Sequence, residues 1–265
     1  MSSSYTAEDI EVLQGIAHVR RRPAMYIGST GTDGLHHLLW EIVDNSVDEA
    51  MNGHASFIKV TLSATGDTVT VEDNGRGIPV DVNPKHGNRS ALELVLTEIG
   101  AGGKFSGNNY KASGGLHGVG SSVVNALSVF LEARVKRDGH EWMQTYKRGR
   151  PKKPIANVGP ARGTGTTITF TPDPEMFEET TFDPDRIQKA LEVKTFLNSG
   201  LRIVFRDLVN RETYDMKHEE GLKDYLRVLV ERSECRSILD APFELGLKAE
   251  DVRIELALTW TDSPK

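Results

Sequence analysis

The chain has 265 residues, an apolar content of 38% and a charged content of 26%, which is typical of a globular protein with one large domain or one and a part. No apolar run approaches the length of a membrane span, the start at Met1 lacks a signal segment, and the single Cys235 excludes an internal disulfide, so we expect a cytoplasmic protein. The net charge of −6 argues against a protein that grips nucleic acid through its overall field.

Two short regions precede the first long helix. Residues 1–16 are polar with a few apolar side chains, among them Tyr5 and Ile10, and are expected to form an arm that packs on a neighbour or a partner chain. Residues 19–29 contain Pro and Gly and are expected to be rich in turns. Asp33 is a candidate N-cap for the helix that follows.

Residues 35–51 predict a helix with one acidic face, since no Gly or Pro interrupts their helical periodicity. Apolar side chains occupy the opposite side. No Lys or Arg on this helix balances the acids, so something positive must lie against them, and a divalent metal is the economical answer. A solvated acidic face is the alternative. The acidic face consists of His37, Glu41, Asp44, Asn45, Asp48 and Glu49.

The remaining pattern mixes hairpins with helices. Ser90, with Glu93 three residues later, is expected to cap a short helix. The order of elements predicts an α+β fold, a two-layer sandwich of helices on a mixed, mostly antiparallel sheet. Strands are expected at 57–62, 68–73, 130–136, 141–147, 166–171, 201–206 and 252–260, and helices at 90–99, 119–127, 185–198 and 219–232.

A glycine motif, Asp73-Asn74-Gly75-Arg76-Gly77-Ile78-Pro79, follows the second strand. Paired glycines let a flat ligand approach the backbone closely. Asp73 at the strand end is then placed to accept a hydrogen bond from an exocyclic amine such as that of adenine. A plain turn with Asp73 as its cap is the alternative.

Residues 100–120 are the most glycine-rich part of the chain and have the composition of a lid. Gly114-Gly115-Leu116-His117-Gly118-Val119-Gly120 opens a helix, and backbone N–H groups at a helix start bind phosphate. The motif differs from a Walker loop and from a dinucleotide fingerprint. Lys104 is available as a point charge for a terminal phosphate.

Two basic clusters, residues 20–22 and 147–153, stand out in an acidic chain. Either could touch a phosphate backbone. Neither is interleaved with aromatic residues, and solvated turns are the commoner explanation of such clusters.

Taken together, the acidic helix, the Asp-x-Gly-x-Gly motif, the Gly-Leu-His-Gly-Val-Gly motif and Gly163-Thr164-Gly165-Thr166 resemble the Bergerat-type ATP-binding fold. DNA gyrase, ninety-kilodalton heat-shock chaperones, sensor histidine kinases and mismatch-repair ATPases share this fold. Within that superfamily the chain most resembles the ATPase subunits of bacterial type IIA topoisomerases. The segments that carry this narrower resemblance are Tyr26-Ile27-Gly28, residues 41–50, Ala101-Gly102-Gly103-Lys104-Phe105, Tyr110-Lys111 and residues 113–120.

The resemblance implies a role for each matching residue. Glu41 is expected to act as general base on the attacking water, oriented by His37, while Asn45 ligates Mg²⁺. Asp73 binds the adenine amine, with Thr166 beside it. The phosphates are wrapped by Gly102, Gly103, Lys104, Leu116, His117, Gly118, Val119 and Gly120. The nucleoside is contacted by Tyr110, the partner's nucleotide by the arm with Tyr5, and the pocket mouth is formed by Glu49 paired with Arg76, by Gly77, Ile78 and Pro79, and by Arg137, where aminocoumarin inhibitors bind.

The resemblance also implies cofactors, partners and domains. ATP and Mg²⁺ are the expected cofactors. An ATP-dependent homodimer through the arm, the DNA-cleaving gyrase A, and DNA are the expected partners, and the dimer would gate strand passage and negative supercoiling. The expected division is an arm at 1–16, an ATP-binding domain at 17–218 and the incomplete start of a transducer domain at 219–265, because no Gln-Thr-Lys loop follows Glu219.

The sequence leaves three alternatives open. The first is the corresponding ATPase of topoisomerase IV, although Gly34-Leu35-His36-His37 favours the gyrase branch of the family. The second is a chain that binds nucleotide with little turnover, because the transducer lysine is missing. The third, a chaperone-type ATPase, is disfavoured by the topoisomerase-like segments. Asn74, where many relatives have Asp, is expected to have little effect.

Overall fold

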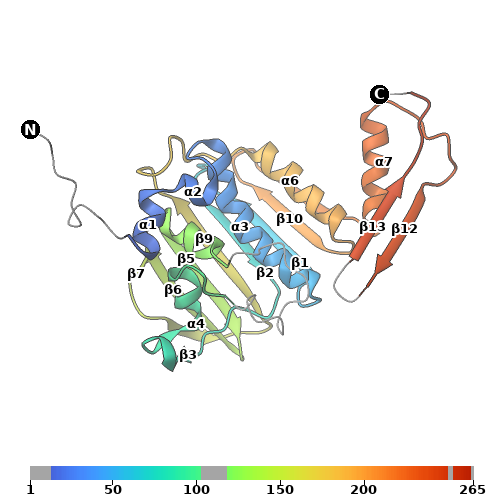
Figure 1. Ribbon diagram of the computed structural model, residues 1–265. Coiled ribbons are helices and arrows are strands. Elements are labelled where there is room, and N and C mark those ends of the chain that lie inside the picture. Colours follow the sequence, from blue (N-terminus) through green and yellow to red (C-terminus); the bar gives the residue numbers. More distant parts are fainter. Residues whose placement is uncertain (1–12, 103–117, 250–252, 264–265) are drawn as a thin grey trace, which may run out of the picture.

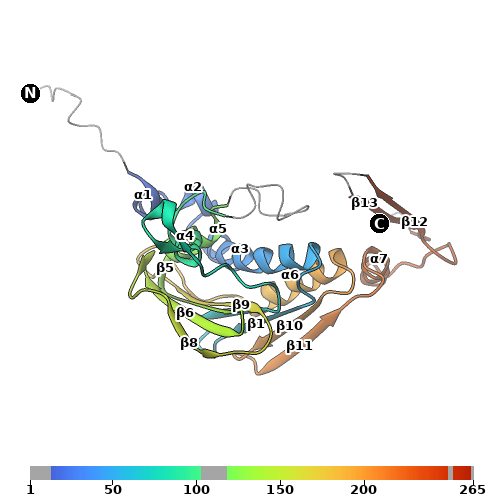
Figure 2. The ribbon, with the colours of Figure 1, turned by 90° about the horizontal axis from the view of Figure 1, so that it is seen from below.

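The computed structural model describes residues 13–102, 118–249 and 253–263. These residues form two layers, a large sheet and a set of helices that covers one of its faces (Figure 2). The α+β sandwich expected from the sequence is therefore confirmed.

The main sheet has nine strands in the order β11-β10-β1-β2-β9-β5-β6-β7, with β8 also paired to β6. β1 and β10 run parallel, whereas the other pairs of this sheet are antiparallel, so the sheet is mixed and mostly antiparallel. The strands are β1 (Phe57–Leu62), β2 (Val69–Asp73), β5 (Ser128–Arg137), β6 (His140–Lys147), β7 (Arg150–Pro151), β8 (Ala156–Pro160), β9 (Gly165–Pro172), β10 (Arg202–Asp207) and β11 (Glu212–Lys217).

Six helices lie on the covered face of the sheet (Figures 1 and 2). The longest, α3, crosses the middle of the molecule and supplies the acidic face expected from the sequence. The helices are α1 (Gly15–Arg21), α2 (Ala24–Ile27), α3 (Thr32–Met51), α4 (Ala91–Thr97), α5 (Gly120–Ala126) and α6 (Pro184–Leu197). A short antiparallel pair, β3 (Val82–Asn83) and β4 (Arg89–Ser90), brackets the 3-10 helix Pro84–His86.

The core lies between the two layers. Along β1 the side chains alternate between partly exposed and buried, so that Ile58, Val60 and Leu62 point inward, as the period of a strand requires. Leu35, Leu38, Leu39, Ile42 and Val43 of α3 meet them and are 0–4% exposed. Burying this apolar stripe fixes the rotation of α3 and turns its polar face away from the core.

Local signals explain several element ends. Ser90 accepts a hydrogen bond from the backbone N–H of Glu93 at 3.1 Å and caps α4, as expected. The hairpin between β5 and β6 turns through Asp138 and Gly139, whose φ angles of +53° and +77° are those of a tight type I′ turn.

Some expectations were wrong. The N-cap of α3 is Gly31 rather than Asp33, which lies in the first turn and pairs with Arg186. Residues 19–29 are more regular than expected, because α1 and α2 fall within them. β8, β11 and the strand that precedes 252–260 were not expected from the sequence at all.

The last described part forms its own small unit beside α6 (Figure 1). It consists of α7 (Leu222–Arg232) and an antiparallel hairpin of β12 (Phe243–Lys248) and β13 (Arg253–Leu258). In the part of the chain that the structure describes, no helix has both the length and the apolar character needed to span a membrane.

Candidate functional site

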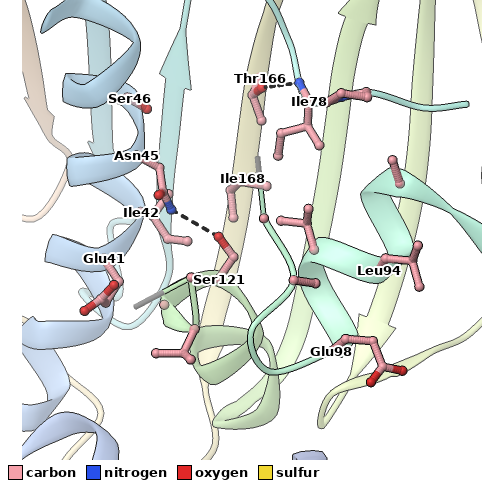
Figure 3. Close-up of a pocket in the computed structure, with 18 of the residues that line it drawn as sticks. Glu41, Ile42, Asn45, Ser46, Ile78, Leu94, Glu98, Ser121, Thr166 and Ile168 are labelled. Atoms are coloured by element: carbon pink, nitrogen blue, oxygen red, sulfur yellow. Dashed lines mark hydrogen bonds between the residues drawn. The ribbon is translucent and has the colours of Figure 1, made fainter. Parts of the chain in front are cut away.

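A pocket of about 1120 Å³ opens between α3, the end of β2, α4 and the start of α5. Its walls combine the polar face of α3 with apolar side chains such as Ile78, Leu94 and Ile168 (Figure 3). A concave site of this size with few, convergent polar groups is typical of a small-molecule site.

The acidic face of α3 divides between the pocket and the surrounding protein. His37, Glu41, Asn45 and Glu49, spaced four residues apart, all line the pocket. The other two acids do not line it. Asp44 forms an ion pair with Lys194 of α6, and Asp48 is only 1% exposed.

Positive side chains from elsewhere in the fold therefore balance part of this acidic face. Lys194 serves Asp44, and Arg76 serves Glu49. Within the described residues there is no group of three or more His, Cys, Asp or Glu side chains that could hold a metal ion. The expectation that the acids themselves require a metal was wrong, because these two cations come from outside the helix.

Glu41 lies at the deep end of the pocket, against the start of α5. His37 Nε2 is 3.1 Å from Glu41 Oε1, one helical turn away, and is placed to orient that carboxylate. A Cβ atom at Gly120 would lie 1.8 Å from Glu41 Oε2. Only a residue without a side chain allows the carboxylate and the start of α5 to approach this closely.

Asn45 faces the same helix start. Its amide nitrogen donates a hydrogen bond to Ser121 Oγ at 3.1 Å (Figure 3). Because the nitrogen is directed at Ser121, the carboxamide oxygen is the atom that Asn45 can offer to a cation. Ser121 also lines the pocket and was not expected from the sequence.

Asp73 ends β2 at the floor of the pocket. Its carboxylate accepts hydrogen bonds from Gly75 N at 2.9 Å, Thr166 N at 3.2 Å and Ser46 Oγ at 3.0 Å. Burial raises the pKa of Asp73, although these three hydrogen bonds act in the opposite direction. The carboxylate is thus a fixed acceptor in a site with little water.

Gly165 lets two backbones meet at this point. Its φ is +152°, and an added Cβ would lie 2.1 Å from the carbonyl oxygen of Asp73. The neighbouring Thr166 hydroxyl accepts a hydrogen bond from Ile78 N at 3.2 Å (Figure 3). The Gly165-Thr166 segment therefore ties β9 to the glycine motif that follows β2.

The expected ion pair at the pocket mouth is confirmed. Arg76 binds Glu49 through Nε at 3.1 Å and Nη2 at 2.7 Å, a bidentate arrangement. Arg137 donates from Nη1 to the carbonyl oxygen of Gly77 at 2.8 Å and so lies beside the same motif.

The pocket collects every expected ligand-binding residue that lies in the described part of the chain. Six others, Tyr5, Gly103, Lys104, Tyr110, Leu116 and His117, lie outside the described residues. Those that line the pocket are His37, Glu41, Asn45, Glu49, Asp73, Arg76, Gly77, Ile78, Pro79, Gly102, Gly118, Val119, Gly120, Arg137 and Thr166.

Comparison with known proteins identifies relatives of this chain. A family described as histidine kinase-, DNA gyrase B-, and HSP90-like ATPase matches residues 30–176. DNA gyrase B of Thermotoga maritima is 49% identical over 264 residues, which cover 98% of this chain and 41% of that protein. DNA gyrase B of Streptococcus pneumoniae is 47% identical over 263 residues, or 98% of this chain and 40% of that protein.

A solved structure has the same fold. The 43K ATPase domain of Thermus thermophilus gyrase B, in complex with an aminocoumarin, superposes with a TM-score of 0.81 at 38% identity. The match covers 94% of this chain and 63% of that one. The chain spans about two fifths of the length of the curated relatives named above.

Proposed function

Because the chain belongs to the family of histidine kinase-, DNA gyrase B- and HSP90-like ATPases, we propose that it is the ATP-binding and ATP-hydrolysing part of a DNA gyrase B. The observation that carries this proposal is the pocket itself. It gathers the motifs by which the sequence resembles this family and holds Asp73 and Glu41 as two carboxylates in different surroundings.

The proposed mechanism divides the work between these carboxylates. Asp73, held by three hydrogen-bond donors, accepts the exocyclic amine of adenine. Glu41 removes a proton from the water that attacks the terminal phosphate, while His37 keeps its carboxylate in place. Gly118, Val119 and Gly120 lie where the phosphates would pass and offer backbone N–H groups.

Magnesium is the cation that these residues fit. Mg²⁺ prefers oxygen ligands, keeps several waters and usually binds through one or two protein groups together with substrate phosphates. Asn45, with its amide nitrogen directed at Ser121, supplies one such oxygen. The metal would arrive with the nucleotide, and it would neutralise charge that develops on the phosphates.

In the whole protein we propose that ATP closes a homodimer, with the arm around Tyr5 reaching the other protomer. Closure would gate the passage of DNA through a complex with gyrase A, and hydrolysis would reset the gate, giving negative supercoiling. A cytoplasmic location follows from the DNA partner. The pocket mouth around Arg76, Ile78 and Arg137 is the proposed site for aminocoumarin-type inhibitors, because a related domain was solved with such a molecule.

Calorimetry with a non-hydrolysable ATP analogue and Mg²⁺ tests the proposal. Asp73→Ala should weaken binding about 10- to 100-fold, since it removes a hydrogen bond to a charged acceptor. Glu41→Ala should bind but not hydrolyse. Asp44→Asn is the matched control, because Asp44 lies on the same helix but outside the pocket.

No binding by the folded parent chain would overturn the proposal. Two alternatives remain distinct from it. The paralogous topoisomerase IV protein would share the pocket but relax rather than supercoil DNA in the reconstituted enzyme. A chain that binds nucleotide with little turnover would show the binding pattern above without hydrolysis, and adding the rest of the gyrase B chain would restore turnover.

A further inference from the structure

Two basic segments that are far apart in the sequence meet at the β7 end of the main sheet. α1 and the turn between β6 and β7 lie side by side there (Figure 1). Together they line a second hollow of about 630 Å³, and no residue lines both this hollow and the nucleotide pocket. The charged residues of the hollow are Arg20, Lys147, Arg148, Arg150 and Lys152.

Close packing of the turn on α1 brings these residues together. Arg148 and Gly149 have φ angles of +52° and +80°, and a Cβ atom at Gly149 would lie 2.5 Å from the side chain of Ile16. The backbone N–H of Arg148 donates to Ser128 O at 2.9 Å. The geometry of the hollow therefore depends on backbone contacts rather than on its lysines.

Two of the five cations have a structural role. Asp173 is completely buried and lies 2.9 Å from both Arg20 Nη1 and Arg148 Nε. Glu175 pairs with the same two arginines at 3.6 and 2.6 Å. This network neutralises Arg20 and Arg148 and ties α1 to the turn.

The other three cations have no carboxylate to neutralise them. Lys147, Arg150 and Lys152 are exposed, and among the described residues none of them forms an ion pair. We call these three side chains the basic patch. Like charges gathered on one surface of a chain with net charge −6 repel each other unless an anion lies against them.

The surroundings of the basic patch indicate the class of anion. No aromatic residue lines the hollow, so the stacking that single-stranded nucleic acids require is not offered there. Exposed Lys and Arg side chains without a stacking platform suit the regularly spaced phosphates of a duplex. Arg21, Arg22 and Lys153, which adjoin the hollow in sequence, are also exposed and add to the positive charge.

We propose that the basic patch binds the phosphate backbone of double-stranded DNA, without sequence preference and apart from the nucleotide pocket. The inference rests on the proposed function, in which the whole protein works on DNA. It adds a contact made by the ATP-binding part itself.

A salt series tests the proposal. Binding of a fluorescent duplex of about 20 base pairs is measured by anisotropy for the full chain and for Lys147→Gln/Lys152→Gln. Loss of two phosphate contacts should lower the slope of log K against log salt by about 1.8 and weaken binding most at low salt. Lys189→Gln/Arg211→Gln is the control, because it removes the same charge from exposed side chains outside the hollow.

Each outcome is decisive. Equal slopes for the two double variants overturn the proposal, including the case in which the basic patch holds an acidic peptide instead of DNA. The slope difference supports it if both variants still bind the ATP analogue as the parent does. A parent that binds nucleotide but no duplex at low salt overturns this inference and leaves the proposed function standing.

Discussion

At the scale of single residues, the site depends on polar atoms held in place before any ligand arrives. Asp73 is the clearest case, because hydrogen bonds from Gly75, Thr166 and Ser46 fix both of its oxygens. Burial outweighs these bonds and raises the pKa of this carboxyl group. A ligand that donates an N–H to Asp73 favours the ionised form and so acts against the raised pKa.

The affinity for adenine nucleotides should therefore depend on the ionisation of Asp73. As the pH falls through the raised pKa, the free protein gains a proton that must leave when the amine binds, so affinity falls and binding releases protons. Calorimetry in buffers of different ionisation enthalpy measures this release. Asp73→Asn should bind more weakly and lose this part of the release, and an unchanged proton count would contradict the adenine role of Asp73.

Glu41 gives a second prediction at this scale. Gly120→Ala would place a methyl group 1.8 Å from Glu41 Oε2, so the carboxylate must leave its position beside His37. Turnover should fall about 100-fold or more, the usual contribution of a general base, while nucleotide affinity changes less. Steady-state kinetics and calorimetry together separate the two effects.

The matched control for this change is Gly246→Ala. Gly246 lies in β12 with open space around its Cα and an ordinary φ, so an added methyl group meets nothing. Its turnover should equal that of the parent. Gly120→Ala with full turnover would show that Glu41 is not needed where the structure places it.

At the scale of helices and strands, a buried imidazole joins α3 to α6. His36 is completely buried; its Nδ1–H donates to Thr32 O at 2.8 Å, and its Nε2 accepts from Asp183 N at 3.0 Å. Asp183 in turn caps α6 by accepting from Asp185 N and Arg186 N. Both ring nitrogens are thus assigned, and the ring must be neutral to accept from Asp183.

Acid should loosen this joint. Burial lowers the pKa of His36 below its ordinary value of about 6.5, so the unfolded chain binds more protons in the window between the two pKa values. The free energy of unfolding is complete above about pH 6.5 and falls as the pH drops through that window. Urea unfolding across this range measures the loss, which His36→Gln should flatten and the exposed His140→Gln should leave unchanged.

The elements predicted from the sequence are those whose burial follows a regular period. β1 has the expected bounds, because its apolar side chains alternate over its whole length. β11 was missed since only Met216 of its residues is buried, and its hydrogen bonds to β10 define it instead.

The candidate site divides in the same way. The sequence indicated which side chains share a face of α3, but not that Lys194 and Arg76 would reach two of its acids, because those contacts depend on how distant elements pack. Ser121 was missed for the same reason, since only the fold places it opposite Asn45.

At the scale of the whole molecule, the described chain has one main core and a smaller unit attached to it. Among the described residues, every member of the core cluster lies at or before Met216, and α7 buries no side chain. The two parts touch through the rings of Phe196 and Tyr225, 5.1 Å apart, and an ion pair of Arg232 with Glu192 at 3.3 Å. The hairpin of the smaller unit exposes large apolar side chains, including Phe243, Leu245, Leu247, Ile254, Leu256, Leu258 and Trp260.

A chain shortened to residues 1–218 should therefore keep its fold and its pocket, because neither the core cluster nor the described lining of the pocket extends beyond that point. Thermal unfolding should stay cooperative with a midpoint close to that of the parent, since an exposed ion pair and one ring contact contribute about 2 kcal/mol at most. Affinity for the ATP analogue should be unchanged. Binding of a hydrophobic dye should fall, because the exposed apolar hairpin is removed. A shortened chain that unfolds at much lower temperature, or that no longer binds nucleotide, would place the domain boundary elsewhere, since the smaller unit would then support a core that the structure assigns to the first 218 residues.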